Sequence, residues 1–160
     1  MNEEKAIMKD AEHMRSLIIG MGGVSRAMHR SLEPKPWFEC AGVVDVTETG
    51  LEAGREVAKL PDAALFKELG PALTELKPDA VLINTPSELH CAQARQCLEA
   101  GCHVLVAKPV TNDFAEAVEL VERARDAGVT LSVAQQMRYN QHYRAVAEYV
   151  RSGALGTVEA

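Results

Sequence analysis

Short apolar runs alternate with amphipathic stretches along most of this 160-residue chain. Runs of four to eight apolar residues between turn residues are typical of buried strands, whereas apolar residues spaced three and four apart indicate helices. Strands and helices of these two kinds alternate about six times, with short connections. The predicted strands cover residues 16–20, 38–45, 64–66, 80–83, 103–106 and 129–134, and the predicted helices cover residues 24–33, 47–60, 70–77, 87–101, 112–127 and 140–152.

This alternation predicts an α/β fold with a parallel, doubly wound sheet of about six strands. The run Ala80-Val-Leu-Ile83 fits a strand buried on both faces, so helices are expected to cover both sides of the sheet. Residues 1–14 are polar and are expected to form a tail.

The ends of several helices are also predicted. Side-chain oxygens of Thr47 and Ser87 are expected to cap their helices, and Thr111 is expected to start the long helix that follows it. Gly101 and Gly128 are expected to end the helices that precede them.

Charge narrows the classes of function. Lysine and arginine number 17 and aspartate and glutamate 23, so the formal net charge is −6. A nucleic-acid surface and a polybasic membrane anchor both need clustered basic residues, so neither partner is expected. No apolar run approaches the roughly 20 residues that span a bilayer, and residues 1–15 lack the apolar segment of a signal peptide. We expect a cytoplasmic protein.

Four cysteines, Cys40, Cys91, Cys97 and Cys102, form no C-x-x-C pair, and no histidine–cysteine cluster has the spacing of a zinc site. No metal is therefore expected. The thiols are expected to be free and buried or half-buried, in a reducing compartment.

A glycine cluster directly follows the first predicted strand. Its sequence, Gly20-Met21-Gly22-Gly23-Val24-Ser25, has the pattern G-x-G-x-x-S, where the dinucleotide fingerprint has glycine or alanine in third place. The first glycine permits a tight turn, the second lets a diphosphate approach the backbone, and the third position needs only a small side chain. The N-terminus of the following helix offers unpaired N–H groups to phosphates. The cluster therefore predicts a dinucleotide-binding loop of the Rossmann type.

Asp45 ends the second predicted strand, 20 residues after Ser25. An acid at about that distance accepts hydrogen bonds from the adenosine ribose hydroxyls. No arginine follows it to receive a 2′-phosphate, which the carboxylate would repel, so NAD is expected rather than NADP. The alternative for Asp45 is a surface or helix-capping role.

Later motifs resemble one family. Residues 81–90 read VLINTPSELH, and residues 98–110 read LEAGCHVLVAKPV. They resemble the patterns A-T-P-x-x-x-H, L-E-A-G-K-H-V-L and E-K-P of the glucose–fructose oxidoreductase / inositol dehydrogenase (Gfo/Idh/MocA-type) family. QMRYN at 136–140 and SGALG at 152–156 are also similar, so the resemblance covers the chain from about residue 15 onward.

The resemblance implies a Rossmann domain followed by an α/β domain with a large, mostly antiparallel sheet. It implies that Thr85 and Pro86 border the cofactor and that Lys108 reaches the nicotinamide and the substrate. An ammonium near an alcohol oxygen would stabilise developing negative charge, so Lys108 is the candidate catalytic residue. The remaining candidates are His90 and Pro109 beside the cofactor and Arg138 and Tyr139 toward the substrate, with structural roles as the alternatives.

Two departures from the family matter. Ala107 replaces the acid of E-K-P. We expect this replacement to affect full activity more than it affects cofactor binding. The catalytic aspartate and histidine of the family lie in its second domain, which begins where this chain stops. The expected organisation is a tail over 1–14, an NAD-binding Rossmann domain over 15–139, and a final helix with the start of the second domain over 140–160.

The sequence therefore predicts an NAD-dependent oxidoreductase that transfers a hydride between a sugar, inositol or related polyol and nicotinamide. The 160 residues alone are expected to be inactive. The rival interpretation is a non-catalytic dinucleotide-binding module or sensor subunit. A Rossmann methyltransferase fits poorly, because it explains neither Thr85-Pro86 nor Lys108-Pro109. A homo-oligomer is compatible with the leading interpretation.

Overall fold

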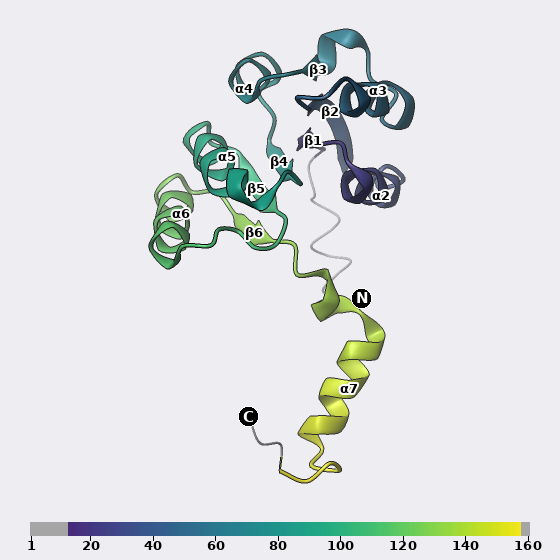
Figure 1. The fold of residues 1–160 in the computed structure, drawn as a ribbon, viewed down its shortest axis with the longest axis vertical. Coiled ribbons are helices and arrows are strands. Elements are labelled where there is room, and N and C mark those ends of the chain that lie inside the picture. The colour runs from purple at the N-terminus through teal and green to yellow at the C-terminus, as the bar shows by residue number, and fades with distance from the viewer. Residues whose placement is uncertain (1–12, 158–160) are drawn as a thin grey trace.

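A computed structural model describes residues 13–157 of the chain. Its six strands form one sheet in the order β3-β2-β1-β4-β5-β6, and all neighbouring strands are parallel (Figure 1). The predicted doubly wound α/β fold is confirmed. The strands are β1 (Met14–Ile19), β2 (Phe38–Val44), β3 (Leu65–Phe66), β4 (Ala80–Ile83), β5 (His103–Val106) and β6 (Leu131–Val133); the helices are α2 (Gly23–Leu32), α3 (Glu48–Val57), α4 (Leu69–Leu76), α5 (Ser87–Glu99), α6 (Phe114–Asp126) and α7 (Gln141–Arg151), with short 3-10 segments η1 (Asp62–Ala64) and η2 (Gln136–Tyr139).

Helices pack on both faces of the sheet because side chains alternate sides along each strand. Leu17 and Ile19 of β1 belong to a core that includes residues of α4, α5 and α6. Ile18, between them, belongs to a smaller core on the other face, which includes residues of α2 and α3. An apolar hollow of about 410 Å³, lined in part by Leu82 and Leu105, remains on this second face. Among the described residues, helices therefore cover both faces of the sheet as predicted, and this hollow leaves part of the second face open.

The strands begin and end slightly differently from the prediction. β1 begins at Met14, inside the predicted tail, because the Met14 N–H donates to the Trp37 carbonyl at 2.7 Å. The rest of that tail, residues 1–12, lies outside the described residues. β6 has only three residues, Leu131–Val133, where six were predicted. α3 ends at Val57 rather than near Leu60, because Lys59 adopts a left-handed backbone conformation with a φ of +55°, which a helix cannot continue through.

The predicted cap Ser87 and the predicted start of the long helix at Thr111 are wrong. Ser87 is the first residue of α5, and the extended Pro86 takes the capping position before it. Asp113 caps α6 in place of Thr111, since its carboxylate accepts a hydrogen bond from the Glu116 N–H at 3.0 Å. The Thr47 cap is confirmed, because its hydroxyl accepts a hydrogen bond from the Gly50 N–H at 3.1 Å.

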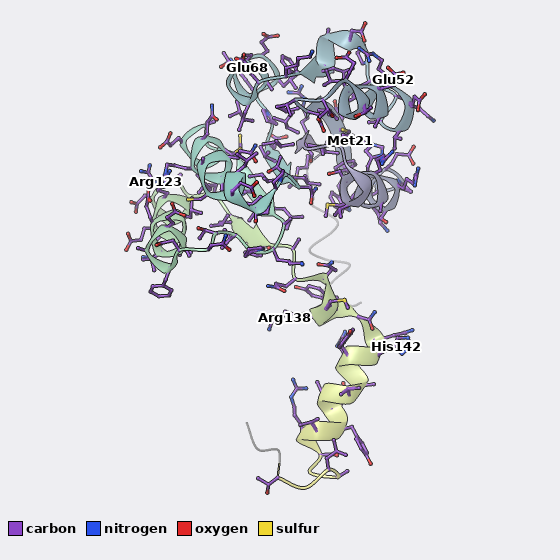
Figure 2. All side chains as sticks on the ribbon, in the orientation of Figure 1. Met21, Glu52, Glu68, Arg123, Arg138 and His142 are labelled. Atoms are coloured by element: carbon purple, nitrogen blue, oxygen red, sulfur yellow. The ribbon has the colours of Figure 1, made fainter. Side chains whose placement is uncertain are left out.

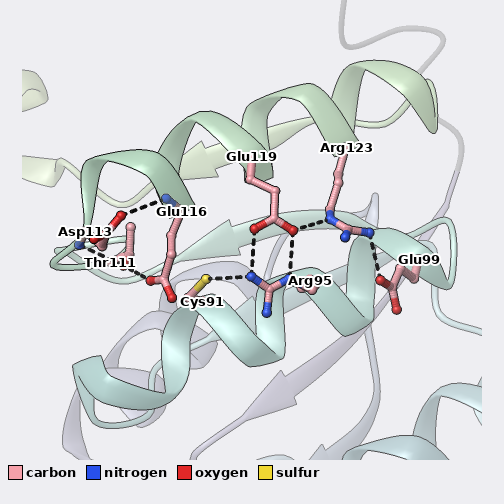
Figure 3. A network of polar contacts seen from close by, with 8 residues as sticks. All are labelled: Cys91, Arg95, Glu99, Thr111, Asp113, Glu116, Glu119 and Arg123. Carbon is pink, nitrogen blue, oxygen red and sulfur yellow. Dashed lines mark hydrogen bonds and ion pairs between the residues drawn. The ribbon is translucent and has the colours of Figure 1, made fainter.

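An ion-pair network joins α5 to α6 (Figure 3). Glu119 of α6 receives two hydrogen bonds from the Arg95 guanidinium, at 2.8 and 3.0 Å, and one from Arg123 at 2.7 Å. Arg123 also reaches back to Glu99 of α5 at 2.8 Å. These hydrogen bonds lower the pKa of Glu119 to about 2. The network fixes the relative position of two helices whose first turns lie at the carboxyl edge of the sheet.

The C-terminal helix α7 extends away from the sheet and its flanking helices (Figure 1). The Asn140 side chain caps it by accepting a hydrogen bond from the His142 N–H at 2.9 Å. Its apolar side chains Tyr143, Val146 and Tyr149 are exposed. In the described part of the chain, no helix combines the length and the apolar character that crossing a membrane requires.

Candidate dinucleotide-binding site

The site lies where the order of the strands reverses. β1 is central in the sheet, with β2 on one side and β4 on the other. The chain leaves β1 toward α2 on one face and leaves β4 toward α5 on the other face. A crevice therefore opens at the carboxyl ends of β1 and β4, the place where open α/β sheets bind their ligands.

The turn after β1 is built around Gly20. Its φ of +81° favours glycine, and a Cβ placed on it would lie 2.9 Å from the Asn84 carbonyl oxygen. The Gly20 N–H donates to the Val44 carbonyl at 2.8 Å. Ser25 is fully buried, and its hydroxyl donates to the Gly20 carbonyl. Gly20 and Ser25 therefore shape the turn from inside.

Gly22 and Gly23 differ from Gly20, because a Cβ on either would meet no protein atom within 4 Å. Gly22 has an ordinary φ of −72° and caps α2 without a side-chain hydrogen bond. The protein itself therefore does not require glycine at these positions, and the open space above them suits a ligand that approaches the backbone. A diphosphate fits this space, since the first N–H groups of the ten-residue helix α2 are free to receive it.

Asp45 lies directly beside this turn. Its Oδ2 accepts a hydrogen bond from the Met21 N–H at 2.8 Å, and its Oδ1 accepts from the Thr47 N–H at 2.8 Å and the Thr47 hydroxyl at 2.7 Å. The carboxylate is thus held between the glycine turn and the start of α3. An ionised carboxylate offers about four acceptor positions, and these three hydrogen bonds leave about one of them for a ribose hydroxyl.

Gly50 permits this position of Asp45, a role of Gly50 that was not predicted from the sequence. Gly50 is buried in the first turn of α3, and a Cβ on it would lie only 2.0 Å from the Asp45 carboxyl carbon. Any larger residue would push the carboxylate away from the Met21 N–H. The only local signal was a glycine inside a predicted helix, which often marks a close approach.

A cleft of about 600 Å³ lies between α2 and the carboxyl ends of β4, β5 and β6. That volume is within the range of small-molecule and cofactor sites. Four predicted site residues line it: Val24, Thr85, His90 and Lys108. Sequence reasoning missed the other lining residues, which are Ala27, Met28, Ser31, Leu32, Asn84, Ser87, Ala107, Ala134 and Gln136.

His90 joins the two loops that form the floor of the cleft. It is 1% exposed, and its Nδ1 and Nε2 lie 2.6 Å from the Pro109 carbonyl oxygen and 2.8 Å from the Thr85 carbonyl oxygen. The Thr85 hydroxyl in turn donates to Oε1 of Gln93 at 2.5 Å. The structure therefore places His90 as a positioning residue for both loops.

Lys108 lies two residues after the end of β5, on the rim of the cleft, and is exposed. Among the described residues no carboxylate forms an ion pair with it, in keeping with Ala107 at the position of the family acid. Arg138 and Tyr139 lie elsewhere: they line a separate hollow of about 580 Å³ beside β6. Figure 2 shows Arg138 near α7, well away from Met21 at the glycine turn.

The four cysteines are free thiols, as predicted, with Cys91, Cys97 and Cys102 buried and Cys40 half-buried. Burial raises the pKa of all four thiols, that of Cys40 to about 11. They are therefore protonated and unreactive at neutral pH.

The glycine turn, the adjoining acid and the cleft at the switch point define a dinucleotide-binding α/β protein. Residues 14–135 match the family described as "Oxidoreductase family, NAD-binding Rossmann fold". The chain belongs to this Gfo/Idh/MocA oxidoreductase family, which confirms the predicted resemblance.

Individual relatives support this assignment. The chain is 31% identical over 153 residues to dTDP-3,4-didehydro-2,6-dideoxy-alpha-D-glucose 3-reductase of Streptomyces violaceoruber, covering 93% of this chain and 44% of that protein. It is 32% identical over 95 residues to scyllo-inositol 2-dehydrogenase (NADP(+)) of Bacillus subtilis, covering 59% of this chain and 26% of that protein. The WlbA dehydrogenase from Bordetella pertussis, solved in complex with NADH and UDP-GlcNAcA, aligns with a TM-score of 0.80 and 26% identity over 91% of this chain and 41% of that one. The chain thus spans less than half the length of these relatives.

Proposed function

We propose that this chain supplies the NAD-binding domain of an oxidoreductase that transfers a hydride between nicotinamide and an alcohol of a sugar, inositol or related polyol. The observation that supports the proposal is the hydrogen bond between Asp45 and the Met21 N–H, because it holds the acid that we expect to bind the ribose against the glycine turn. Relatives that act on sugars and on inositol support the substrate class.

Three places among the described residues would each hold one part of the cofactor. The open face of Gly22 and Gly23 and the N-terminus of α2 would hold the diphosphate. Asp45 would accept the hydroxyls of the adenosine ribose, and its charge favours NAD over NADP. The nicotinamide end would then enter the cleft, with Thr85 and Pro86 on one side and Lys108 and Pro109 on the other.

Bound there, the nicotinamide supplies a centre that accepts or donates a hydride. The Lys108 ammonium at the rim would orient the substrate alcohol and stabilise negative charge that develops on its oxygen. No carboxylate lines the described cleft, and both ring nitrogens of His90 already face backbone carbonyls. We therefore expect the described residues to bind the cofactor but to supply no free base for the alcohol proton.

The experiment is a titration of the purified 160-residue chain with NADH, followed by fluorescence, beside an absorbance screen for NADH formation with sugars, inositols and polyols. We expect saturable binding and no measurable turnover, since general-base help alone is worth about 10²–10⁴-fold. An absence of binding would refute the cofactor domain. Sustained turnover would refute this division of labour and would show that the proton acceptor is within these residues.

The second candidate function is a dinucleotide-binding module without catalysis. Ala107 beside Lys108 favours it, because the family has an acid there. Restoring that acid with Ala107→Glu, in a form of the protein that carries the second domain of the family, separates the two functions. An oxidoreductase would keep or gain turnover, whereas a binding module would show none in either form.

A further inference from the structure

One polar group of the cleft has no partner within the protein. Asn84 directly follows β4 and lines the cleft beside Thr85. Its Nδ2 is buried and makes no hydrogen bond to any described residue. Buried donors in folded proteins are nearly always paired, so an unpaired one requires an explanation.

The side chains of Thr85 and His90, beside Asn84, already have neighbours within the protein. The Thr85 hydroxyl donates to Gln93, and the ring nitrogens of His90 face the carbonyls of Thr85 and Pro109. The backbone of Asn84 is also fixed, because its N–H donates to the Ile19 carbonyl at 2.9 Å. The Asn84 amide is therefore an unpaired donor, carried by a backbone position that is fixed beside the cleft.

The order of the strands indicates which part of a dinucleotide this amide would meet. Asp45 follows β2 on one side of β1, and Asn84 follows β4 on the other side. A dinucleotide that places its adenosine ribose on Asp45 and its diphosphate over Gly22 must direct its other half toward β4. That half is the nicotinamide riboside.

We infer that Asn84 binds the nicotinamide riboside half of the cofactor by donating a hydrogen bond from its side-chain amide. This inference rests on the proposed function. It assigns a cofactor-binding role to a position where the A-T-P pattern of the family has alanine, a residue that cannot donate from its side chain.

The test compares NADH with ADP, which contains the adenosine and diphosphate but lacks the nicotinamide riboside. Asn84→Ala should weaken NADH binding about 10-fold by calorimetry, which corresponds to about 1.4 kcal/mol, and should leave ADP binding unchanged. Asn84→Asp keeps the shape but replaces the donor with acceptors, so it should weaken NADH binding at least as much. Asp45→Ala is the matched control, because it should weaken NADH and ADP alike.

Thermal unfolding provides a second readout. Asn84→Ala removes an unpaired buried donor, so the melting temperature of the free chain should stay the same or rise. Unchanged NADH affinity, an equal loss for ADP, or a clear fall in melting temperature would each overturn the inference. A wild-type chain that binds neither ligand would refute the proposed function and this inference together, whereas wild-type binding with an unaffected variant would refute this inference alone.

Discussion

Gly50→Ala should weaken NAD binding although Gly50 lies under Asp45 and not in the cleft. The new Cβ would lie 2.0 Å from the Asp45 carboxyl carbon, whereas ordinary contact begins at 3.4 Å. The carboxylate must move, and a shift of that size breaks its 2.8 Å hydrogen bond to the Met21 N–H. A displaced carboxylate can no longer receive the ribose hydroxyls in the same geometry.

The magnitude follows from the contacts that are lost. Hydrogen bonds to a charged acceptor are worth about 1.5–3 kcal/mol, so NAD affinity should fall about 10- to 100-fold. Alanine in place of glycine stabilises a helix by about 1 kcal/mol, which offsets part of the loss within the folded chain. Binding should therefore suffer more than stability.

Calorimetric titration with NAD and thermal unfolding should be measured for Gly50→Ala, Asp45→Ala and the double variant. Without the carboxylate there is nothing for the new methyl group to displace, so the double variant should bind like Asp45→Ala alone. Gly70→Ala is the control, since its Cβ would make an ordinary contact of 3.5 Å with Gln96. Additive losses in the double variant, or wild-type affinity in Gly50→Ala, would refute the reasoning.

Three further predictions concern the turn, the cofactor and the ion-pair network. Gly22→Val should abolish NAD binding, because its side chain would fill the space expected to hold the diphosphate, and should leave the melting temperature unchanged, because it meets no protein atom there. Calorimetry and thermal unfolding check this, and retained binding would mean that the diphosphate lies elsewhere. The wild-type chain should bind NAD at least about 10-fold more tightly than NADP, and equal calorimetric affinities would contradict the role given to Asp45. Glu119→Gln should lower the melting temperature at neutral pH, and the difference from wild type should shrink as the pH falls from 4.5 to about 2. The sign follows because a carboxyl with a lowered pKa stabilises the fold above its ordinary pKa and loses that effect on protonation; a difference that persists at pH 2 would contradict it.

Local patterns in the sequence were enough to predict the sheet, the glycine turn and the acid beside it. Gly20 and Asp45 each follow an apolar strand, and the ends of parallel strands meet at one edge of the sheet, so their proximity follows from the order of the elements. Helix caps were harder to predict, because Thr111 and Asp113 are both good capping residues two positions apart. Only the backbone geometry shows that Asp113 takes that position.

The parts that were missed depend on contacts between elements. The need for Gly50 arises from the direction in which the Asp45 side chain points, which no spacing reveals. The unpaired amide of Asn84 becomes visible only once the partners of Thr85 and His90 are known. Arg138 and Tyr139, which the resemblance assigns to the substrate side, line a separate hollow beside β6, and their role toward the substrate stays a prediction.

The contrast between Gly20 and Gly22 has a consequence for how this domain can diverge. Selection for folding alone would keep Gly20, where a side chain meets the Asn84 carbonyl, but would let Gly22 and Gly23 drift to larger residues. Selection for a bound dinucleotide would keep all three. A library of random variants sorted first for stability and then for NAD capture should therefore retain glycine at position 20 in both pools and at positions 22 and 23 only in the second. A lineage that gave up its cofactor would show the loss first at those two exposed positions.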